Sequence, residues 1–163
     1  MKLQTLQTND VPAMWRINEE GLPGVGKVSE EALANLLSLA AMPLGAYESD
    51  ALVGFVLCLL PGTQYASPNY GWFNSHYDQF LYVDRIAVST THRDRQVGTQ
   101  LYARVIEHAE RYTWPIAAEV SLEPPNPGSM RFHDRHGFTE VGKLTHEKQV
   151  VTMLMRQPKT LVA

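Results

Sequence analysis

Hydrophobic residues along the chain follow two spacings, one typical of β-strands and one typical of α-helices. Residues 51–60 and 80–88 are short, mostly apolar runs, which indicates strands. Residues 97–112 instead carry apolar side chains at every third or fourth position, which indicates a helix with one buried side. Both kinds of segment recur, so the pattern predicts a protein built from strands and helices.

Over the whole chain, these spacings predict seven strands and four helices. The strands are expected at residues 3–6, 44–47, 51–60, 80–88, 116–122, 139–141 and 149–155. The helices are expected at about residues 10–20, 29–39, 97–112 and 127–136, with candidate N-caps at Asn9 or Asp10, Ser29 and Asn126. This order predicts an α/β fold with a mixed sheet, and the length of 163 residues predicts a single domain at 1–163. Residues 157–163 are expected to fray.

Residues 61–79 fit neither spacing and are long for a loop. Loops of this length are usually functional or disordered, and a high aromatic content argues against disorder. We therefore predict an ordered segment that covers part of a site, with aromatic side chains that line an acceptor site or pack over the core as a lid. These aromatic residues are Tyr65, Tyr70, Trp72, Phe73 and Tyr77.

The charge and cysteine content restrict the classes of function. The net charge is −3 and the sequence pI is about 6.0, so bulk charge gives no reason to expect nucleic acid or a membrane as a partner. Cys58 is the only cysteine and lies in an apolar run, which excludes a disulfide within the chain and predicts a buried thiol. The sequence shows no signal-peptide pattern and no apolar stretch of membrane-spanning length, so we expect a cytoplasmic protein.

Two strand–loop–helix units carry the candidate chemistry. In the first, residues 93–99 (Arg-Asp-Arg-Gln-Val-Gly-Thr) join the strand end at 86–88 to the helix at 97–112. Such a loop presents backbone N–H groups and basic side chains to an anion. In the second, residues 126–138 follow the strand at 116–122 and place polar side chains at the end of a neighbouring strand. Together the units predict a site for a phosphate-bearing cofactor.

These two motifs, in this order and each after a strand, resemble those of the GNAT superfamily of acyl-CoA-dependent N-acetyltransferases. The family's acetyl-CoA loop, Arg-x-x-Gly-x-Gly/Ala, is matched from Arg93 to Gly98, except that Gln96 replaces the first glycine. The family's next signature, Asn-x-x-Ala/Ser-x-x-Phe-Tyr-x-x-x-Gly-Phe, is matched, with histidine in place of tyrosine, by Asn126, Ser129, Phe132, His133, Gly137 and Phe138. Residues 82–85 and 119–127 look like those of a bacterial-type subgroup of unassigned substrate.

The element order is similar to that of the family over nearly the whole chain. The resemblance implies a GNAT-like mixed, mostly antiparallel central sheet of about seven strands flanked by about four helices. It also implies acetyl-CoA as the acyl donor, no metal, and a primary amine as the acceptor, in a small molecule or at a peptide N-terminus. Direct attack in a ternary complex is expected because Cys58 looks buried. The resemblance leaves a homodimer open.

The resemblance also indicates which residues bind the cofactor. The loop would bind the pyrophosphate of coenzyme A through N–H groups at a helix N-terminus, with charge-assisted contacts from Arg93 and Arg95. The strand end would bond the pantetheine amides with its backbone, and Asn126 would bond the pantetheine arm. Alternatively, the loop is a solvated basic turn and Asn126 is only an N-cap. The full set is Ile86, Ala87, Val88, Arg93, Arg95, Gln96, Val97, Gly98, Thr99, Asn126, Ser129 and Phe132.

Transfer to an amine needs one group that protonates the departing thiolate and another that accepts the proton of the amine. By resemblance, His133 stands in the place of the family's proton-donating tyrosine, although it is alternatively a packed or capping histidine. The candidate bases are Glu119, Asp84 and Tyr82, and Asp84 alternatively forms an ion pair with Arg85. A coenzyme A-binding sensor or regulatory module without turnover is the alternative function.

Overall fold

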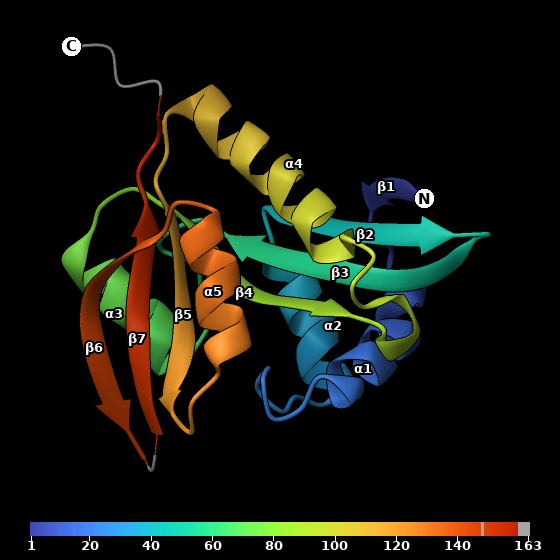
Figure 1. The fold of residues 1–163 in the computed structure, drawn as a ribbon, viewed down its shortest axis with the longest axis horizontal. Coiled ribbons are helices and arrows are strands. Elements are labelled where there is room, and N and C mark those ends of the chain that lie inside the picture. Colours follow the sequence, from blue (N-terminus) through green and yellow to red (C-terminus); the bar gives the residue numbers. More distant parts are fainter. Residues whose placement is uncertain (148, 160–163) are drawn as a thin grey trace. The chain divides into compact units, whose positions relative to one another are not determined.

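The computed structural model describes residues 1–147 and 149–159 of the 163-residue chain. Its strands form a seven-stranded sheet in the order β1-β2-β3-β4-β5-β7-β6 (Figure 1). The strands are β1 (Lys2–Thr5), β2 (Met42–Glu48), β3 (Ala51–Leu59), β4 (Leu81–Val88), β5 (Ile116–Glu123), β6 (Thr139–His146) and β7 (Gln149–Arg156). The helices are α1 (Val11–Glu20), α2 (Glu30–Leu39), α3 (Pro68–His76), α4 (Val97–Tyr112) and α5 (Pro127–Arg135), and the 3₁₀ helices are η1 (Thr8–Asp10) and η2 (Thr90–His92).

The sheet is mixed, as the sequence predicts. Strand β4 pairs with β5 in parallel, whereas β1 with β2, β2 with β3, β5 with β7 and β6 with β7 pair antiparallel. The predicted mixed, mostly antiparallel sheet of seven strands is therefore confirmed. The described residues form five α-helices instead of four, because a helix lies within the segment predicted to be a loop.

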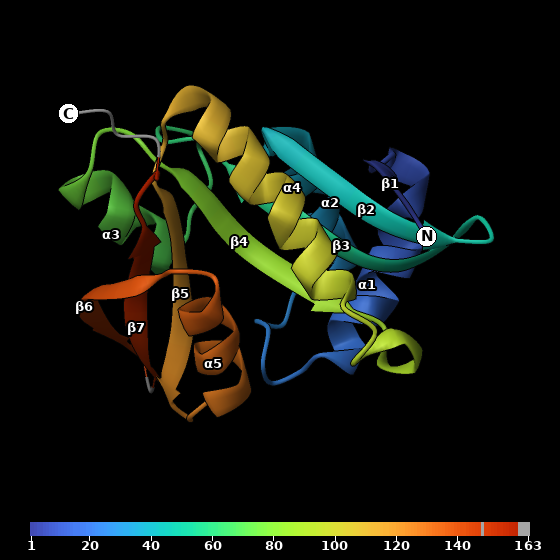
Figure 2. The same ribbon diagram turned by 45° about the horizontal axis from the view of Figure 1, so that its top comes forward.

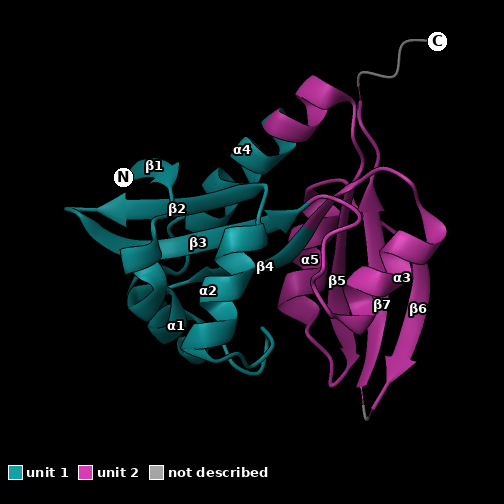
Figure 3. Cartoon of the chain, turned by 180° about the vertical axis from the view of Figure 1, so that it is seen from behind, with its two compact units in different colours: residues 1–59, 83–107 teal, residues 60–82, 108–163 magenta. Residues whose placement is uncertain are grey.

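The chain forms two compact units, each built from two stretches of the sequence (Figure 3). Unit 1 contains residues 1–59 and 83–107. Unit 2 contains residues 60–82 and 108–163, of which 148 and 160–163 lie outside the described part. Strand β4 and helix α4 each begin in one unit and continue into the other. The expectation of a single domain stays a prediction, and each unit is described by itself.

In unit 1, helices cover both faces of the antiparallel strands β1, β2 and β3. Helices α1 and α2 lie on one face, and the first turns of α4 lie on the other (Figure 1 and Figure 2). Gly54 of β3 permits the close approach of α4, because a Cβ atom there would lie 2.9 Å from Val97 Cγ1 and 3.2 Å from the Ala87 oxygen. Ser49 and Asp50, with φ angles of 51° and 66°, form the β2–β3 turn in the left-handed conformation typical of a type I′ hairpin.

In unit 2, helices α3 and α5 lie on opposite faces of the antiparallel strands β5, β7 and β6 (Figure 1 and Figure 3). Helix α3 packs against β6, where Trp72 comes so close that a Cβ atom at Gly142 would lie 2.6 Å from its Cζ2 atom. Tyr70 and Phe73 of α3 are fully buried, and their rings contact the ring of Tyr82 with centroids 5.2 Å and 5.8 Å away. These contacts hold α3 against the sheet.

The sequence predicts an ordered segment at 61–79 but misses helix α3 within it. The helix begins at Pro68, after the N-cap Ser67, whose hydroxyl accepts from the Tyr70 N–H at 3.3 Å. Asparagine, glycine, serine and aromatic residues have low helix propensity, so the local signal for a helix is weak. Burial of Tyr70 and Phe73 stabilises the helix instead, because tertiary packing overrides local preference.

The C-terminal predictions need two corrections. Strand β6 extends to His146, beyond the predicted end at 141, because the register shifts between Glu140 and Gly142 and a bulge there interrupts the alternation. Residues 157–159 are not frayed, since Pro158 is buried and the Lys159 N–H donates to Glu110 Oε1 at 2.9 Å. The rest of the predicted tail, 160–163, lies outside the described residues. Among residues 1–147 and 149–159, no helix combines the length and the hydrophobicity of a membrane-spanning segment.

Candidate active site

The predicted cofactor loop of unit 1 leads from β4 through η2 into helix α4. Residues 97–99 form the first turn of α4, whose N–H groups have no carbonyl partner within the helix. The helix dipole adds partial positive charge at this turn, and the exposed Arg95 stands just before it. The loop therefore has the backbone geometry of an anion-binding site.

Arg93 makes contacts that the sequence does not predict. Its Nη2 donates to the Glu20 carbonyl oxygen at 3.0 Å, and its Nε donates to the Val88 carbonyl oxygen at 3.4 Å. The guanidinium therefore ties the loop to the ends of α1 and β4. The Glu20 carboxylate accepts from the Thr90 N–H at 2.8 Å, and this bond lowers the pKa of that carboxyl. Arg93 thus positions the loop in this structure, and Arg93 and Arg95 are both exposed.

Gln96, which replaces the first glycine of the family motif, has a φ angle of 62°. A non-glycine residue in the left-handed region costs about 1–3 kcal/mol, whereas glycine loses about 0.5–1 kcal/mol more chain entropy on folding. We therefore expect Gln96→Gly to raise the free energy of unfolding by about 0.5–1 kcal/mol, measured by urea denaturation. Gln96→Ala keeps the Cβ atom and should not stabilise the protein. Equal gains from both variants would show that the backbone angle is not the cause.

Asp84 and Arg85, which are neighbours on β4, form a buried ion pair in unit 1. Arg85 Nε lies 2.7 Å from Asp84 Oδ2, and the side chains of Arg85 and Asp84 are 9% and 4% exposed. Arg85 Nη1 also donates to Asn18 Oδ1 and to the Gly26 carbonyl oxygen, each at 3.0 Å. The structure therefore shows the ion pair that the sequence leaves as an alternative to a base role for Asp84.

Cys58 on β3 is fully buried, which confirms the expected buried thiol. Burial, together with the negative charge of nearby Asp84, raises the pKa of this thiol. The thiolate is the nucleophilic form of cysteine, so a thiol with a raised pKa is a poor nucleophile. The environment of Cys58 therefore favours direct transfer over a covalent acyl-cysteine intermediate.

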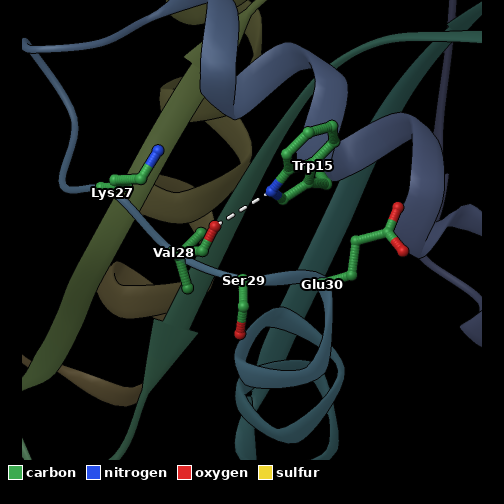
Figure 4. A pocket seen from close by; sticks show the side chains of 5 residues that line it. All are labelled: Trp15, Lys27, Val28, Ser29 and Glu30. Carbon is green, nitrogen blue, oxygen red and sulfur yellow. Dashed lines mark hydrogen bonds between the residues drawn. The ribbon is translucent and has the colours of Figure 1, made fainter.

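A surface pocket that the sequence does not predict lies in unit 1, where α1 faces the start of α2 (Figure 4). Trp15 Nε1 donates to the Val28 carbonyl oxygen at 3.0 Å, which holds the connection between the two helices. The hydroxyl of Ser29 is engaged as the N-cap of α2 and accepts from the Ala32 N–H at 3.0 Å. The residues that line the pocket are Trp15, Lys27, Val28, Ser29 and Glu30.

In unit 2, a hydrogen bond joins two of the candidate bases. The Tyr82 hydroxyl donates to Glu119 Oε1 at 2.9 Å, and Asn69 Nδ2 donates to the same oxygen at 3.0 Å. Asn69 Oδ1 in turn lies 3.0 Å from His146 Nε2. Tyr82 is fully buried and Glu119 is half-buried. The structure thus places Tyr82 and Glu119 together with two residues that the sequence analysis does not name.

This cluster can transfer protons. A carboxylate that lies within hydrogen-bond distance of a substrate's proton can act as a general base. Within residues 1–147 and 149–159, no group of three or more His, Cys, Asp or Glu side chains is placed to hold a metal ion.

The sequence misses Asn69 and His146 for two separate reasons. Asn69 lies in the segment predicted to be a loop, and His146 lies beyond the predicted end of its strand. Neither residue belongs to a motif, and the two approach each other because α3 packs against β6. Only the tertiary structure shows that they join the hydrogen-bonded cluster of Tyr82 and Glu119.

His133 in α5 is buried, with 4% of its surface exposed. Its Nδ1 lies 2.8 Å from the Ser129 carbonyl oxygen, so this nitrogen carries a proton and donates it to the bond. The ring makes edge contacts with Phe132 and Phe138 at centroid distances of 5.6 Å and 5.0 Å. Burial lowers the pKa of the imidazole, which reduces the fraction of imidazolium at neutral pH. These features favour the packed-histidine alternative over the acid role.

The lowered pKa of His133 predicts how stability depends on pH. The unfolded chain takes up this proton at a higher pH, so the free energy of unfolding should fall as the pH decreases below about 6.5. The contribution of one group is at most about 1.4 kcal/mol per pH unit. His133→Phe should flatten this dependence, measured as the urea midpoint at about pH 7.5 and about pH 5.5. His108→Phe is the control variant. If the urea midpoint of His133→Phe changes with pH as steeply as that of His108→Phe, the effect belongs to other groups.

The remaining candidates on α5 have local roles as well. Asn126 Oδ1 accepts from the Ser129 N–H at 3.3 Å, so the predicted N-cap is present. Phe132 is half-buried, and the Arg135 guanidinium lies 5.9 Å from its ring centroid. Capping and cofactor binding are compatible, because the Asn126 amide group has further hydrogen-bonding capacity. The cofactor role of these residues stays a prediction.

Two of the five aromatic residues predicted to line an acceptor site are fully buried, namely Tyr70 and Phe73. The Tyr70 hydroxyl donates to the Leu60 carbonyl oxygen and accepts from the Thr63 N–H at 3.0 Å and the Thr63 hydroxyl at 2.9 Å. Tyr70 and Phe73 therefore pack the core of unit 2 and hold the segment before α3, which favours the packing alternative for these two residues. The half-buried candidates that remain are Tyr65, Trp72 and Tyr77.

Known proteins share both the sequence pattern and the fold. Residues 12–138 match the family model described as the acetyltransferase (GNAT) family. Among solved structures, the chain is similar to Ard1 from Thermoplasma volcanium, with a TM-score of 0.77, 14% identity and coverage of 96% of this chain and 97% of that chain. The ribosomal-protein-alanine N-acetyltransferase from Brucella melitensis has a TM-score of 0.72, 18% identity and coverage of 96% and 99%. NAA60 from Arabidopsis thaliana, in complex with a bisubstrate analogue, has a TM-score of 0.76, 15% identity and coverage of 97% and 98%. No curated protein sequence matches the chain.

Proposed function

Because the chain belongs to the GNAT family of acetyltransferases, we propose that it transfers an acetyl group from acetyl-CoA to a primary amine by direct attack in a ternary complex. The observation that carries this mechanism is the hydrogen bond between Tyr82 and Glu119. An ammonium group has no lone pair, so the acceptor must lose a proton before its nitrogen attacks the thioester carbonyl carbon. Glu119 takes this proton, directly or through a water, and Tyr82 helps to hold the carboxylate.

The donor site is the loop of residues 93–99 at the start of α4. By linkage, coenzyme A at a hundred times its dissociation constant should raise the free energy of unfolding by about 2.7 kcal/mol. Gly98→Asp places a side chain and a negative charge at the helix N-terminus, so it should abolish the stabilisation, measured as a thermal shift. Gly26→Asp is the matched control, because a Cβ atom there meets nothing within 4 Å. No thermal shift for the unmutated protein with acetyl-CoA would contradict this donor.

The departing thiolate of coenzyme A takes up a proton, because a thiol has a reference pKa of about 8.5. His133 is the donor that the family resemblance implies, but its burial, its lowered pKa and its bond to Ser129 support a packing role. We therefore expect His133→Phe to lower kcat by less than about tenfold, measured as thiol release. A loss of about 10²–10⁴, the usual contribution of a proton donor, would restore the acid role.

The acceptor class is a primary amine, and a peptide α-amino group fits this chemistry best. An α-amino group has a reference pKa of about 7.7–8.0, against about 10.4 for lysine, so roughly a tenth of it is unprotonated at pH 7. One similar structure points the same way, because it is named a ribosomal-protein-alanine N-acetyltransferase. The half-buried Tyr65, Trp72 and Tyr77 are the aromatic candidates for contact with the acceptor.

A panel of small amines and short peptides, assayed for thiol release from acetyl-CoA, tests this function. Turnover with at least one amine is the expected result. Coenzyme A binding without turnover across the panel would favour the alternative, a sensor or regulatory module. The cytoplasmic location, the single domain, the homodimer, and the absence of nucleic-acid and membrane partners stay predictions.

A further inference from the structure

We propose that Asn69 and His146 are positioning residues that hold the Glu119 carboxylate in the orientation needed to accept a proton. This inference rests on the proposed function of Glu119 as the general base. The three side chains come from three elements of unit 2, because Asn69 lies on α3, Glu119 on β5 and His146 at the end of β6. Elements that are far apart in the sequence thus converge on one carboxylate.

The hydrogen-bond directions in this cluster follow from the chemistry of the groups. A carboxylate only accepts, so Asn69 must present its NH₂ group to Glu119, at 3.0 Å. The carbonyl oxygen of the same amide then faces His146, whose Nε2 at 3.0 Å must be the donor. His146 therefore fixes which way the Asn69 amide points, and the amide fixes the carboxylate. A residue at 146 that cannot donate would remove this orientation.

The carboxylate is held from a second direction by Tyr82. Its hydroxyl and the Asn69 amide both donate to Glu119 Oε1, at 2.9 Å and 3.0 Å. Two donors from different elements restrict rotation of the carboxylate about its last side-chain bond. A misplacement of about 1 Å in a catalytic group can lower a rate by about 10²-fold, so loss of one donor should reduce turnover.

Helix α3 is packed so that Asn69 reaches this position. Trp72 of α3 lies against Gly142 of β6, which leaves no room for a Cβ atom and brings the helix onto the strand that ends at His146. Asparagine has a lower helix propensity than alanine, so Asn69 contributes little to the stability of helix α3 through its backbone preference. The Asn69 side chain instead makes hydrogen bonds to Glu119 and to His146.

The experiment measures kcat and KM in Asn69→Ala, His146→Ala, His146→Gln and the Asn69→Ala/His146→Ala double variant. We expect Asn69→Ala to lower kcat roughly tenfold to a hundredfold, as for residues that orient metal ligands, and His146→Ala to lower it by less. KM for acetyl-CoA should not change. His146→Gln should recover most of the rate, because its amide NH₂ can donate in place of Nε2. The matched control is Thr145→Ala, an exposed neighbour on β6.

The double variant shows whether the two residues act through one path. If His146 acts only through Asn69, the double variant should be no slower than Asn69→Ala. Unchanged kcat in His146→Ala, failure of His146→Gln to recover the rate, or additive losses in the double variant would each overturn the inference.

A second readout separates this inference from the proposed function. The carboxyl ¹³C resonance of Glu119 should shift in Asn69→Ala and in His146→Ala but not in Thr145→Ala, with or without turnover. Absence of turnover in the unmutated protein with every amine would contradict the proposed function. An unchanged Glu119 resonance in both variants would contradict the inference alone.

Discussion

Glu119→Gln is expected to lower kcat for amine acetylation by about 10²–10⁴, the usual contribution of a general base. Glutamine keeps the shape of the side chain and an oxygen that accepts from Tyr82 and Asn69, but it cannot take up a proton. The loss should be largest at low pH and smaller as the pH rises, because more of the acceptor amine is then already unprotonated. Thiol release from acetyl-CoA, followed over a range of pH, measures this effect.

Asp84→Asn is the matched comparison, since Asp84 is the other acidic candidate on the strands of the sheet. The ion pair of Asp84 with Arg85 assigns its charge to the structure of unit 1. Asp84→Asn should therefore change stability while keeping the unmutated dependence of rate on pH. If Glu119→Gln also keeps that dependence, Glu119 is not the base, and water or Tyr82 must carry the proton.

Arg85→Ala is expected to lower the free energy of unfolding by about 3–5 kcal/mol, the usual cost of breaking a buried ion pair from one side. Removal of the guanidinium leaves the carboxylate of Asp84, only 4% exposed, without its 2.7 Å partner. It also removes the donor to Asn18 Oδ1 and to the Gly26 carbonyl oxygen. Urea denaturation of the two proteins measures the difference.

The control for this prediction is the pair of Lys27 and Glu19, whose charged atoms lie 3.6 Å apart. The Lys27 side chain is 79% exposed, so Lys27→Ala should cost no more than about 1 kcal/mol. Arg85→Lys keeps the positive charge but loses the several N–H donors of the planar guanidinium. Its loss in free energy of unfolding should therefore lie between those of Arg85→Ala and Lys27→Ala. A cost below about 1 kcal/mol for Arg85→Ala would show that the pair does not stabilise unit 1.

Features that depend on residues close together in the chain could be predicted from the amino-acid sequence. The strands and four of the helices follow from the spacing of apolar residues, and the N-caps at Ser29 and Asn126 follow from local hydrogen bonds. The loop that ends at Gly98 and the motif that starts at Asn126 have residue spacings typical of the GNAT family. These two motifs were therefore enough to identify the family from the sequence. Local backbone preferences are enough to produce each of these features.

Which polar side chains lie within hydrogen-bond distance of one another depends on the tertiary packing. In the sequence, Asp84 and Glu119 are equivalent acidic residues on strands, but one pairs with Arg85 and the other accepts from Tyr82. Tertiary packing also determines that α3 is a helix and that Asn69 reaches His146, 77 positions further along the chain. A buried polar group takes whichever partner the packing brings within hydrogen-bond distance, because leaving it unsatisfied costs free energy. That choice depends on how elements distant in the sequence pack, which the spacing of residues along the chain does not specify.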